Sequence, residues 1–260
     1  MTTTAEKRTG IQLKSARELD VMAVGGRILA RTLTLLRASV RPGISTGELD
    51  KIGEDFIRSH PGAVPAFKGL YGFSGSVCTS VNQEIVHGIP SRKRVLAEGD
   101  IVSLDVGVKY EGLYTDSAIT VPVGEISAAD QRLLDVTEES LRAGIAAAVV
   151  GNHVGDIGHA VQTVVERARF SVVRELVGHG VGYGPHEDPQ VPNHGKPKRR
   201  EKLLPGLTIA IEPMVNAGLP GTKTLADRWT VVTVDGKRSA HFEHTIAITE
   251  AGPRILTLAD

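Results

Sequence analysis

The chain has 260 residues, of which 30 are lysine or arginine and 30 are aspartate or glutamate, so its formal net charge is zero. A balanced charge gives no general attraction to nucleic acid or to an anionic membrane surface. A chain of this length buries roughly 70 to 75% of its unfolded surface, which is enough for a core without cross-links. Cys78 is the only cysteine, so an internal disulfide is excluded and a reducing compartment is expected.

The N-terminus is polar from Met1 to Gly10 and lacks the apolar stretch of a secretion signal. Later segments do not approach the roughly 20 apolar residues of a membrane span. We therefore expect a flexible tail over residues 1–14, a single catalytic domain over residues 15–260, and a soluble cytoplasmic protein. A monomer is expected, because a chain of this length can form a self-contained core.

Four helices are predicted, two in each half of the chain. Ser15 is followed three residues later by Glu18, and Ser45 by Glu48, which is the pattern of a capping box. The predicted helices run from 15 toward 36 with a stop at 42–43, from 45 to the Pro61-Gly62 pair, over 128–149 and over 154–170.

Segments rich in Val, Ile and Thr predict strands between these helices. They are residues 76–81, 101–108, 114–121, 208–216, 230–234 and 241–249. Tyr110-Glu111-Gly112 predicts a hairpin turn. Residues 98–105 lie over residues 205–212 with glycine on glycine and carboxylate on carboxylate, which indicates an internal repeat. We expect an α+β fold with one curved antiparallel sheet backed by helices, and a pseudo-two-fold axis that brings the paired carboxylates together.

Asp105 ends the apolar run of one predicted strand, and Asp116, Glu212 and Glu243 lie in or beside others. Each alone is more commonly a cap or an ion-pair partner. Together they would repel one another strongly, and a pair of divalent ions is the simplest neutralisation. His179, between two glycines, is the candidate nitrogen ligand. Oxygen-rich ligands with one or two histidines favour Mn, Fe or Co over a structural zinc site.

Seven segments, in order along the chain, are similar to those of type I methionine aminopeptidases, a family with the pita-bread fold. They are VNQEIVHGIP (81–90), SLDVG (103–107), YTD (114–116), GHGVG (178–182), PHEDP (185–189), IEP (211–213) and FEHT (242–245). The resemblance runs from about residue 15 to the C-terminus. It implies hydrolytic removal of the N-terminal methionine from nascent proteins, with a preference for a small second residue.

The resemblance also implies which residues hold the two divalent ions, whose identity (Co, Mn, Fe or Zn) it leaves open. It implies that Asp105 chelates one ion and that His179 and Glu212 bind the other. Asp116 and Glu243 would bridge the pair. The ions would activate a water molecule, and Glu212 would accept its proton as general base.

Two further histidines receive roles from the resemblance. It implies that His186 hydrogen-bonds the scissile amide, and that His87 stabilises the transition state or assists the departing amine. From the residues alone, each would be read as a histidine that supports its neighbours or lies at the surface. Pro185 stands where some members carry an aromatic residue, so the outer rim of the substrate pocket is left open.

Cys78 and Trp229 match positions that line the methionine pocket in the family, and Phe67, Leu70 and Phe73 are expected as further walls. Sulfur and aromatic groups suit a thioether side chain. For Cys78 the simpler alternative is a small buried hydrophobic residue.

Three alternatives are less consistent with the sequence. Proline-cleaving enzymes of the same fold usually carry a separate N-terminal domain, and type II methionine aminopeptidases carry a long insertion, for which there is no room between His186 and Glu212. A metal-free binding protein is disfavoured because all five ligand positions hold competent side chains.

The basic run of residues 196–200 reads as a solvated loop, with a transient ribosome contact as the alternative. No DNA or membrane partner is expected.

Overall fold

The computed structural model describes residues 10–259. Its four long helices are α1 (Ala16–Ser39), α2 (Thr46–Arg58), α3 (Ala128–Ala147) and α4 (Val154–Arg167). Both predicted capping boxes are formed: the serine hydroxyl accepts a hydrogen bond from the glutamate N–H, and the glutamate carboxylate accepts one from the serine N–H. All four predicted helices are present, although α2, α3 and α4 end earlier than expected.

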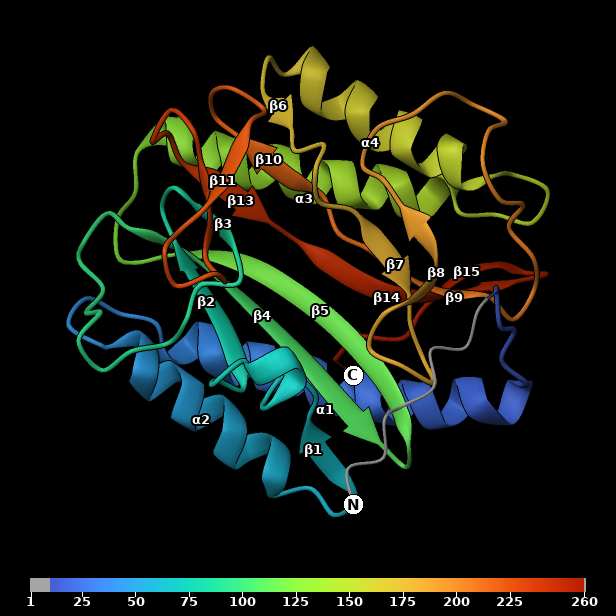
Figure 1. The fold of residues 1–260 in the computed structure, drawn as a ribbon, viewed down its shortest axis with the longest axis horizontal. Helices are drawn as coiled ribbons and strands as arrows, with labels where there is room; N and C mark the ends of the chain where they lie inside the picture. The colour runs from blue at the N-terminus through green and yellow to red at the C-terminus, as the bar shows by residue number, and fades with distance from the viewer. Residues whose placement is uncertain (1–9, 260) are drawn as a thin grey trace.

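The main sheet has nine strands and is antiparallel, with the order β1-β4-β5-β14-β9-β7-β8; β2 pairs with β4, and β15 with β14. Its strands are β1 (Ala63–Pro65), β2 (Val77–Val81), β4 (Ile101–Tyr110), β5 (Leu113–Pro122), β7 (Gly178–Gly180), β8 (Glu187–Val191), β9 (Thr208–Ile211), β14 (Glu243–Thr249) and β15 (Gly252–Ile255). In Figure 1, β4, β5 and β14 run between the α1–α2 pair on one side and the α3–α4 pair on the other.

Two three-stranded sheets complete the fold, with the orders β13-β10-β6 and β11-β12-β3. Their strands are β3 (Glu84–Val86), β6 (Ser171–Val172), β10 (Met214–Asn216), β11 (Thr222–Thr224), β12 (Val231–Thr233) and β13 (Ser239–His241). A short 3-10 helix, η1 (Leu70–Gly72), precedes β2. In Figure 1, β3, β6, β10, β11 and β13 gather at the upper left, close to α3.

The two halves of the chain build matching parts of the main sheet. β5 and β14 meet at its centre, and β4 and β9, which carry the repeated segments, each lie one strand further out. One apolar cluster packs α1 and α2 on β2 and β4, through residues such as Leu29 and Leu104. Another packs α3 and α4 on β9 and β14, through residues such as Leu141 and Ile246. The α+β class and the arrangement in two related halves are confirmed.

Two predicted strands are each divided in the structure. The segment 208–216 forms β9 and β10, and the segment 241–249 forms β13 and β14. Pro213 has no N–H for a ladder, so the chain leaves the main sheet there and continues in a small one. Phe242 makes the opposite crossing beside it, and its N–H donates to the Pro213 carbonyl at 3.4 Å. These adjacent crossings create the bend in which Glu212 and Glu243 lie.

Smaller points concern the strand boundaries, one turn and the short strands. Asp105, expected at the end of an apolar run, lies in the middle of β4, because pairing with β5 continues to the Tyr110–Leu113 pair. The predicted turn is confirmed, with Glu111 at φ 46° and Gly112 at φ 89°. β1, β3, β6, β7, β8, β11 and β15 were not predicted, since runs of two to five residues carry too little periodicity.

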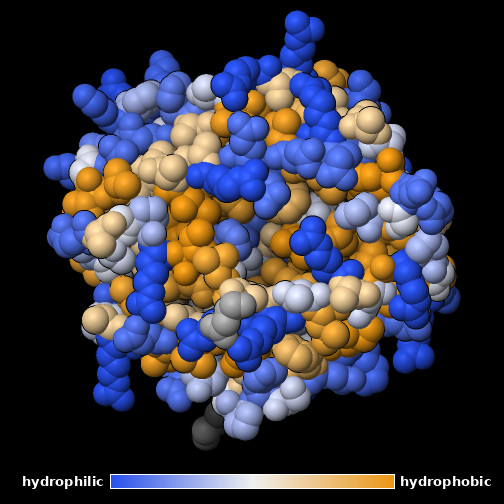
Figure 2. Space-filling view, turned by 180° about the vertical axis from the view of Figure 1, so that it is seen from behind, coloured by the Kyte–Doolittle hydropathy of each residue, from blue (hydrophilic) through white to orange (hydrophobic). Residues whose placement is uncertain are grey.

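Hydrophilic and apolar side chains are interspersed over the face behind that of Figure 1, as Figure 2 shows. This mixture is normal for a folded protein surface. Among residues 10–259, no helix has the length and apolar character needed to cross a bilayer.

The start of the domain differs from the expectation. Residues 1–9 of the predicted tail lie outside the described residues, but Leu13 bridges Leu207, and the Lys14 N–H donates to the Gly206 carbonyl at 2.7 Å. The Lys14 ammonium lies 2.5 Å from Glu187, and the two side chains are only 1% and 10% exposed. The prediction of a loose tail through residue 14 is therefore wrong for these residues, because a buried ion pair fixes them to the domain.

This pair gives a test of the fold. Lys14→Met should lower the free energy of unfolding by about 3 to 5 kcal/mol, because it leaves the Glu187 carboxylate buried without its cation. Urea unfolding measures the change. The control is Lys51→Met, which removes an ion pair with Asp55 whose side chains are 64% and 61% exposed. The control should cost at most about 1 kcal/mol; equal losses in the two variants would show that burial of the Lys14 pair has no special weight.

Candidate metal centre

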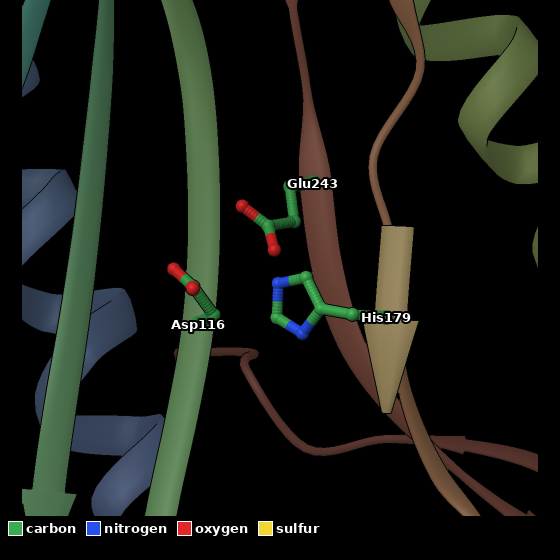
Figure 3. Close-up of side chains that lie close together, drawn as sticks. All are labelled: Asp116, His179 and Glu243. Carbon is green, nitrogen blue, oxygen red and sulfur yellow. The ribbon is translucent and has the colours of Figure 1, made fainter. Parts of the chain in front are cut away.

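Three carboxylates share one face of the main sheet because of strand register. Asp105 on β4 is opposite Ala118 on β5, and Ala118 is opposite Glu243 on β14. Directly opposite residues point to the same side, and so does Asp116, two residues before Ala118. The predicted convergence from distant parts of the sequence is thus a consequence of the sheet. Figure 3 shows the side chains of Asp116, Glu243 and His179 gathered in one small region of the structure.

The nitrogen donor comes from the second half of the chain. Ligand atoms of Asp116, His179 and Glu243 all lie within 4.8 Å of one another. His179 Nδ1 is 2.9 Å from the Gly180 carbonyl, so Nδ1 carries the proton and the lone pair of Nε2 is free to bind a metal ion. Nε2 lies 3.4 Å from Glu212 Oε1. Glu212, directly after β9, is held by the Asn193 amide, which donates to its main-chain carbonyl at 2.9 Å.

Burial has the largest effect on the pKa values of the carboxyl groups in this cluster. It raises the pKa of Asp105 to about 7. Burial, reinforced by the neighbouring carboxylates, raises the pKa of Asp116, Glu212 and Glu243 well above the usual range. Among the described residues, Asp105 Oδ1, Asp116 Oδ1 and Glu243 Oε1 have no hydrogen-bond partner. Buried oxygens left in this way, together with one imidazole nitrogen, fit a divalent metal ion as the missing partner.

All the predicted site residues line one cavity of about 290 Å³. The carboxylates, His179, His87 and His186 supply its polar part. In the same cavity Phe67, Phe73 and Cys78 form a small buried cluster, with Leu70 and Trp229 packed against it. The Phe73 and Trp229 rings meet edge to face, with their centroids 5.1 Å apart. The cavity is therefore shaped for an apolar side chain whose attached polar group reaches the carboxylates.

The two other histidines of the cavity are uncharged. Burial lowers the pKa of His87 to about 4 and also lowers the pKa of His186. The His186 ring lies 4.5 Å from the His179 ring, and the His87 ring lies 6.3 Å from Trp229. His87 has a φ of 60°, a left-handed backbone that is uncommon for a residue with a side chain. Both imidazoles can each donate one hydrogen bond into the cavity.

Sequence reasoning missed several residues of the cavity lining: Tyr71, Val86, Leu176, Val177 and Met214. The apolar ones carried no local signal. Tyr71 is 77% exposed, and its ring stacks on His186 with the centroids 6.3 Å apart. It follows Gly69-Leu70 in a glycine-rich stretch, which was the available signal. The described lining contains Tyr71 and not Pro185, so Tyr71 supplies an aromatic group beside His186.

Comparisons with known proteins agree with this geometry. A sequence model of metallopeptidase family M24 matches residues 20–250. The chain belongs to this metallopeptidase family. Among M24 relatives, "Methionine aminopeptidase 1" of Bacillus subtilis (strain 168) is 59% identical over 94% of this chain and 98% of its own length. "Methionine aminopeptidase 1" of Mycobacterium tuberculosis (strain CDC 1551 / Oshkosh) is 48% identical over 96% of each chain.

Two solved structures superpose on this chain and show the same fold. A methionine aminopeptidase from Thermotoga maritima superposes with a TM-score of 0.94 at 44% identity, covering 96% of this chain and all of that one. A prolidase from Pyrococcus horikoshii OT3 reaches a TM-score of 0.76 at 20% identity, over 95% of this chain and 64% of that one. The second likeness concerns the fold alone. The pita-bread fold expected from the sequence is confirmed.

The buried acids make the metal-free protein sensitive to pH. Acids in an unfolded chain ionise near pH 4, whereas the folded chain raises the pKa of Asp105 to about 7. The folded state therefore retains protons that the unfolded state has released, and its free energy of unfolding should fall as the pH rises from about 4 through about 7. Saturating Mn²⁺ should offset this fall, because the ion binds the ionised carboxylates.

Urea unfolding at several pH values, with chelator and with Mn²⁺, measures this effect. Asp105→Asn, which cannot ionise, should show a shallower decline than the unchanged chain. Stability of the metal-free protein that stays level or increases over this pH range would contradict the proposed burial of ionisable carboxyl groups.

Proposed function

We propose that this protein is a methionine aminopeptidase that hydrolyses the bond after an N-terminal methionine with the help of two divalent ions. The observation that supports this best is the cavity itself, whose lining combines five side chains suited to metal binding with a cluster of sulfur and aromatic groups. The relatives named methionine aminopeptidase, at up to 59% identity among those described above, support the same substrate. We further propose a preference for a small residue after the methionine.

In this proposal, Asp105 would hold one ion, His179 and Glu212 would hold the other, and Asp116 and Glu243 would be ligands shared by the two. The donor set accepts Mn, Fe, Co or Zn. When bound, such ions supply the positive charge that lowers the pKa of a water molecule and polarises a carbonyl group. Glu212 then accepts the proton of the attacking water, as its position at the bend beside the other ligands allows.

The substrate is oriented by the rest of the cavity. Its methionine side chain lies against Phe67, Leu70, Phe73, Cys78 and Trp229, where a thioether gains favourable contacts with aromatic rings. A closely fitted apolar wall also excludes water from the reacting bond. That exclusion strengthens every electrostatic interaction inside the cavity.

The neutral histidines donate hydrogen bonds where negative charge develops. His186, beside His179, donates to the carbonyl oxygen of the scissile bond. His87, on the Trp229 side, hydrogen-bonds the departing amine. Because burial lowers the pKa of His87 to about 4, it acts as a neutral donor at the pH of a cell.

The proposed substrates are the N-terminal peptides of nascent proteins, in the cytoplasm, and the proposed working state is a monomer. Residues 196–200 are all exposed, as a solvated basic loop would be. A brief contact of this loop with the ribosome remains the alternative to that reading.

The first test of this proposal uses the ligands. The metal-free protein should gain activity on Met-Gly-Met when Mn, Fe or Co is added, and Asp105→Ala and Glu212→Ala should lose both metal and activity by 10-fold or more, roughly the effect of losing a ligand or its support. Elemental analysis and peptide hydrolysis are the measurements. Glu250→Gln, at an exposed turn, is the control. Unchanged metal content in both alanine variants would remove these residues from the ligand set.

The second test separates binding of metal from chemistry. His87→Ala should lower kcat about 10²- to 10⁴-fold, because it removes a donor needed in the transition state, while both ions stay bound. Exposed His159→Ala should change neither quantity. If His87→Ala instead lost its metal, the role assigned to His87 would be wrong.

A further inference from the structure

His241 is a buried polar residue that the proposed mechanism does not use. It ends β13, two residues before Glu243, and is 1% exposed. Among the described residues, neither of its ring nitrogens has a hydrogen-bond partner. Native proteins rarely leave both polar atoms of a buried side chain in this state, since each unsatisfied group costs about 1 to 3 kcal/mol. The burial of this imidazole without a hydrogen-bond partner therefore calls for an explanation.

Its backbone is fixed more firmly than that of an ordinary strand end. The His241 N–H donates to the Thr120 hydroxyl at 2.8 Å, and the same hydroxyl lies 2.8 Å from the His241 carbonyl, to which it donates. On the other edge of β13, His241 pairs with Met214 of β10. The imidazole therefore starts from a defined point at the crossing between the small and the main sheet.

The ring is directed at the metal centre from behind Glu212. His241 Nε2 lies 3.7 Å from Glu212 Oε2, while the other oxygen, Oε1, lies 3.4 Å from His179 Nε2. The Glu212 carboxylate thus stands between two imidazoles, one on each oxygen. His241 itself is outside the lining of the cavity, so it meets Glu212 and not the bound peptide.

The chemistry of this contact follows from the surroundings. An imidazole ring carries an N–H on at least one of its two nitrogens, whether it is neutral or charged. A carboxylate oxygen accepts hydrogen bonds and has none to give when ionised. The tautomer with the proton on Nε2 is therefore favoured beside Glu212 Oε2, and a small movement shortens the contact to a hydrogen bond.

We infer that His241 is a positioning residue: its Nε2–H holds Glu212 Oε2 and so fixes the plane of the carboxylate, with Oε1 left free on the side of His179. This inference rests on the proposed role of Glu212 as a metal ligand. A carboxylate held on its outer oxygen loses less freedom when it binds an ion, and donors of this kind are worth 10- to 100-fold, roughly, in metal affinity or activity. His241 would therefore act on the metal centre through Glu212, without direct contact with the substrate.

The test compares two replacements of similar size. His241→Gln retains an N–H at about the reach of Nε2, whereas His241→Leu removes it. Calorimetric titration of the metal-free proteins with Mn²⁺ should show affinity about 10- to 100-fold weaker for His241→Leu and within about threefold of the original for His241→Gln. On Met-Gly-Met, His241→Leu should lower kcat and leave KM nearly unchanged. Circular dichroism and thermal unfolding establish that each variant is folded.

Two outcomes would overturn the inference. One is a folded His241→Leu that binds Mn²⁺ and turns over as the original does. The other is a folded His241→Gln as weak as His241→Leu, since the loss would then come from packing and not from the donated hydrogen bond. Glu212→Gln separates this inference from the proposed function: if that variant loses metal while His241→Leu keeps it, only the role of His241 fails.

Discussion

The structure depends on keeping four carboxyl groups close together with little exposure to solvent. Asp105, Asp116 and Glu243 come from three neighbouring strands, and Glu212 comes from the bend where β9 leaves the main sheet. Ionised acids at this density repel one another, and burial raises the pKa of each. Positive charge supplied by metal ions removes both costs. The centre is therefore a source of strain in the metal-free protein and a source of stability once ions are bound.

The fold provides this arrangement by joining two related halves. Each half contributes a pair of helices and part of the curved sheet, and the acids lie where β5 and β14 meet. The divided strands matter as much as the continuous ones, because the crossings at Pro213 and Phe242 bring Glu212 and His241 to the same bend. A polar centre is thus built on regular strands, which hold side chains more rigidly than loops do.

Local signals in the sequence were sufficient for the helices and for part of the sheet. The serine and glutamate pairs at the starts of α1 and α2 form the predicted caps, and the turn at Glu111-Gly112 joins β4 to β5 as expected. The repeat correctly indicated two halves. These features depend on neighbours within a few residues, so a single sequence carries the information.

Contacts between distant segments could not be predicted from local patterns in the sequence. The burial of Lys14 against Glu187 and the approach of His241 to Glu212 depend on residues 173 and 29 positions apart, and no local pattern marks either pair. The roles of His87, His186 and the pocket residues came from family resemblance alone. The sequence located the acids, but only the sheet register explains why Asp105 and Glu243 share a face.

Anomalous diffraction from crystals grown with Mn²⁺ tests the central claim most directly. The account predicts two peaks inside the cavity, about 3.5 to 4 Å apart as in other two-metal sites, with Asp116 and Glu243 contacting both ions. A fully occupied crystal with its manganese elsewhere, or with Asp116 and Glu243 contacting no common ion, would contradict it.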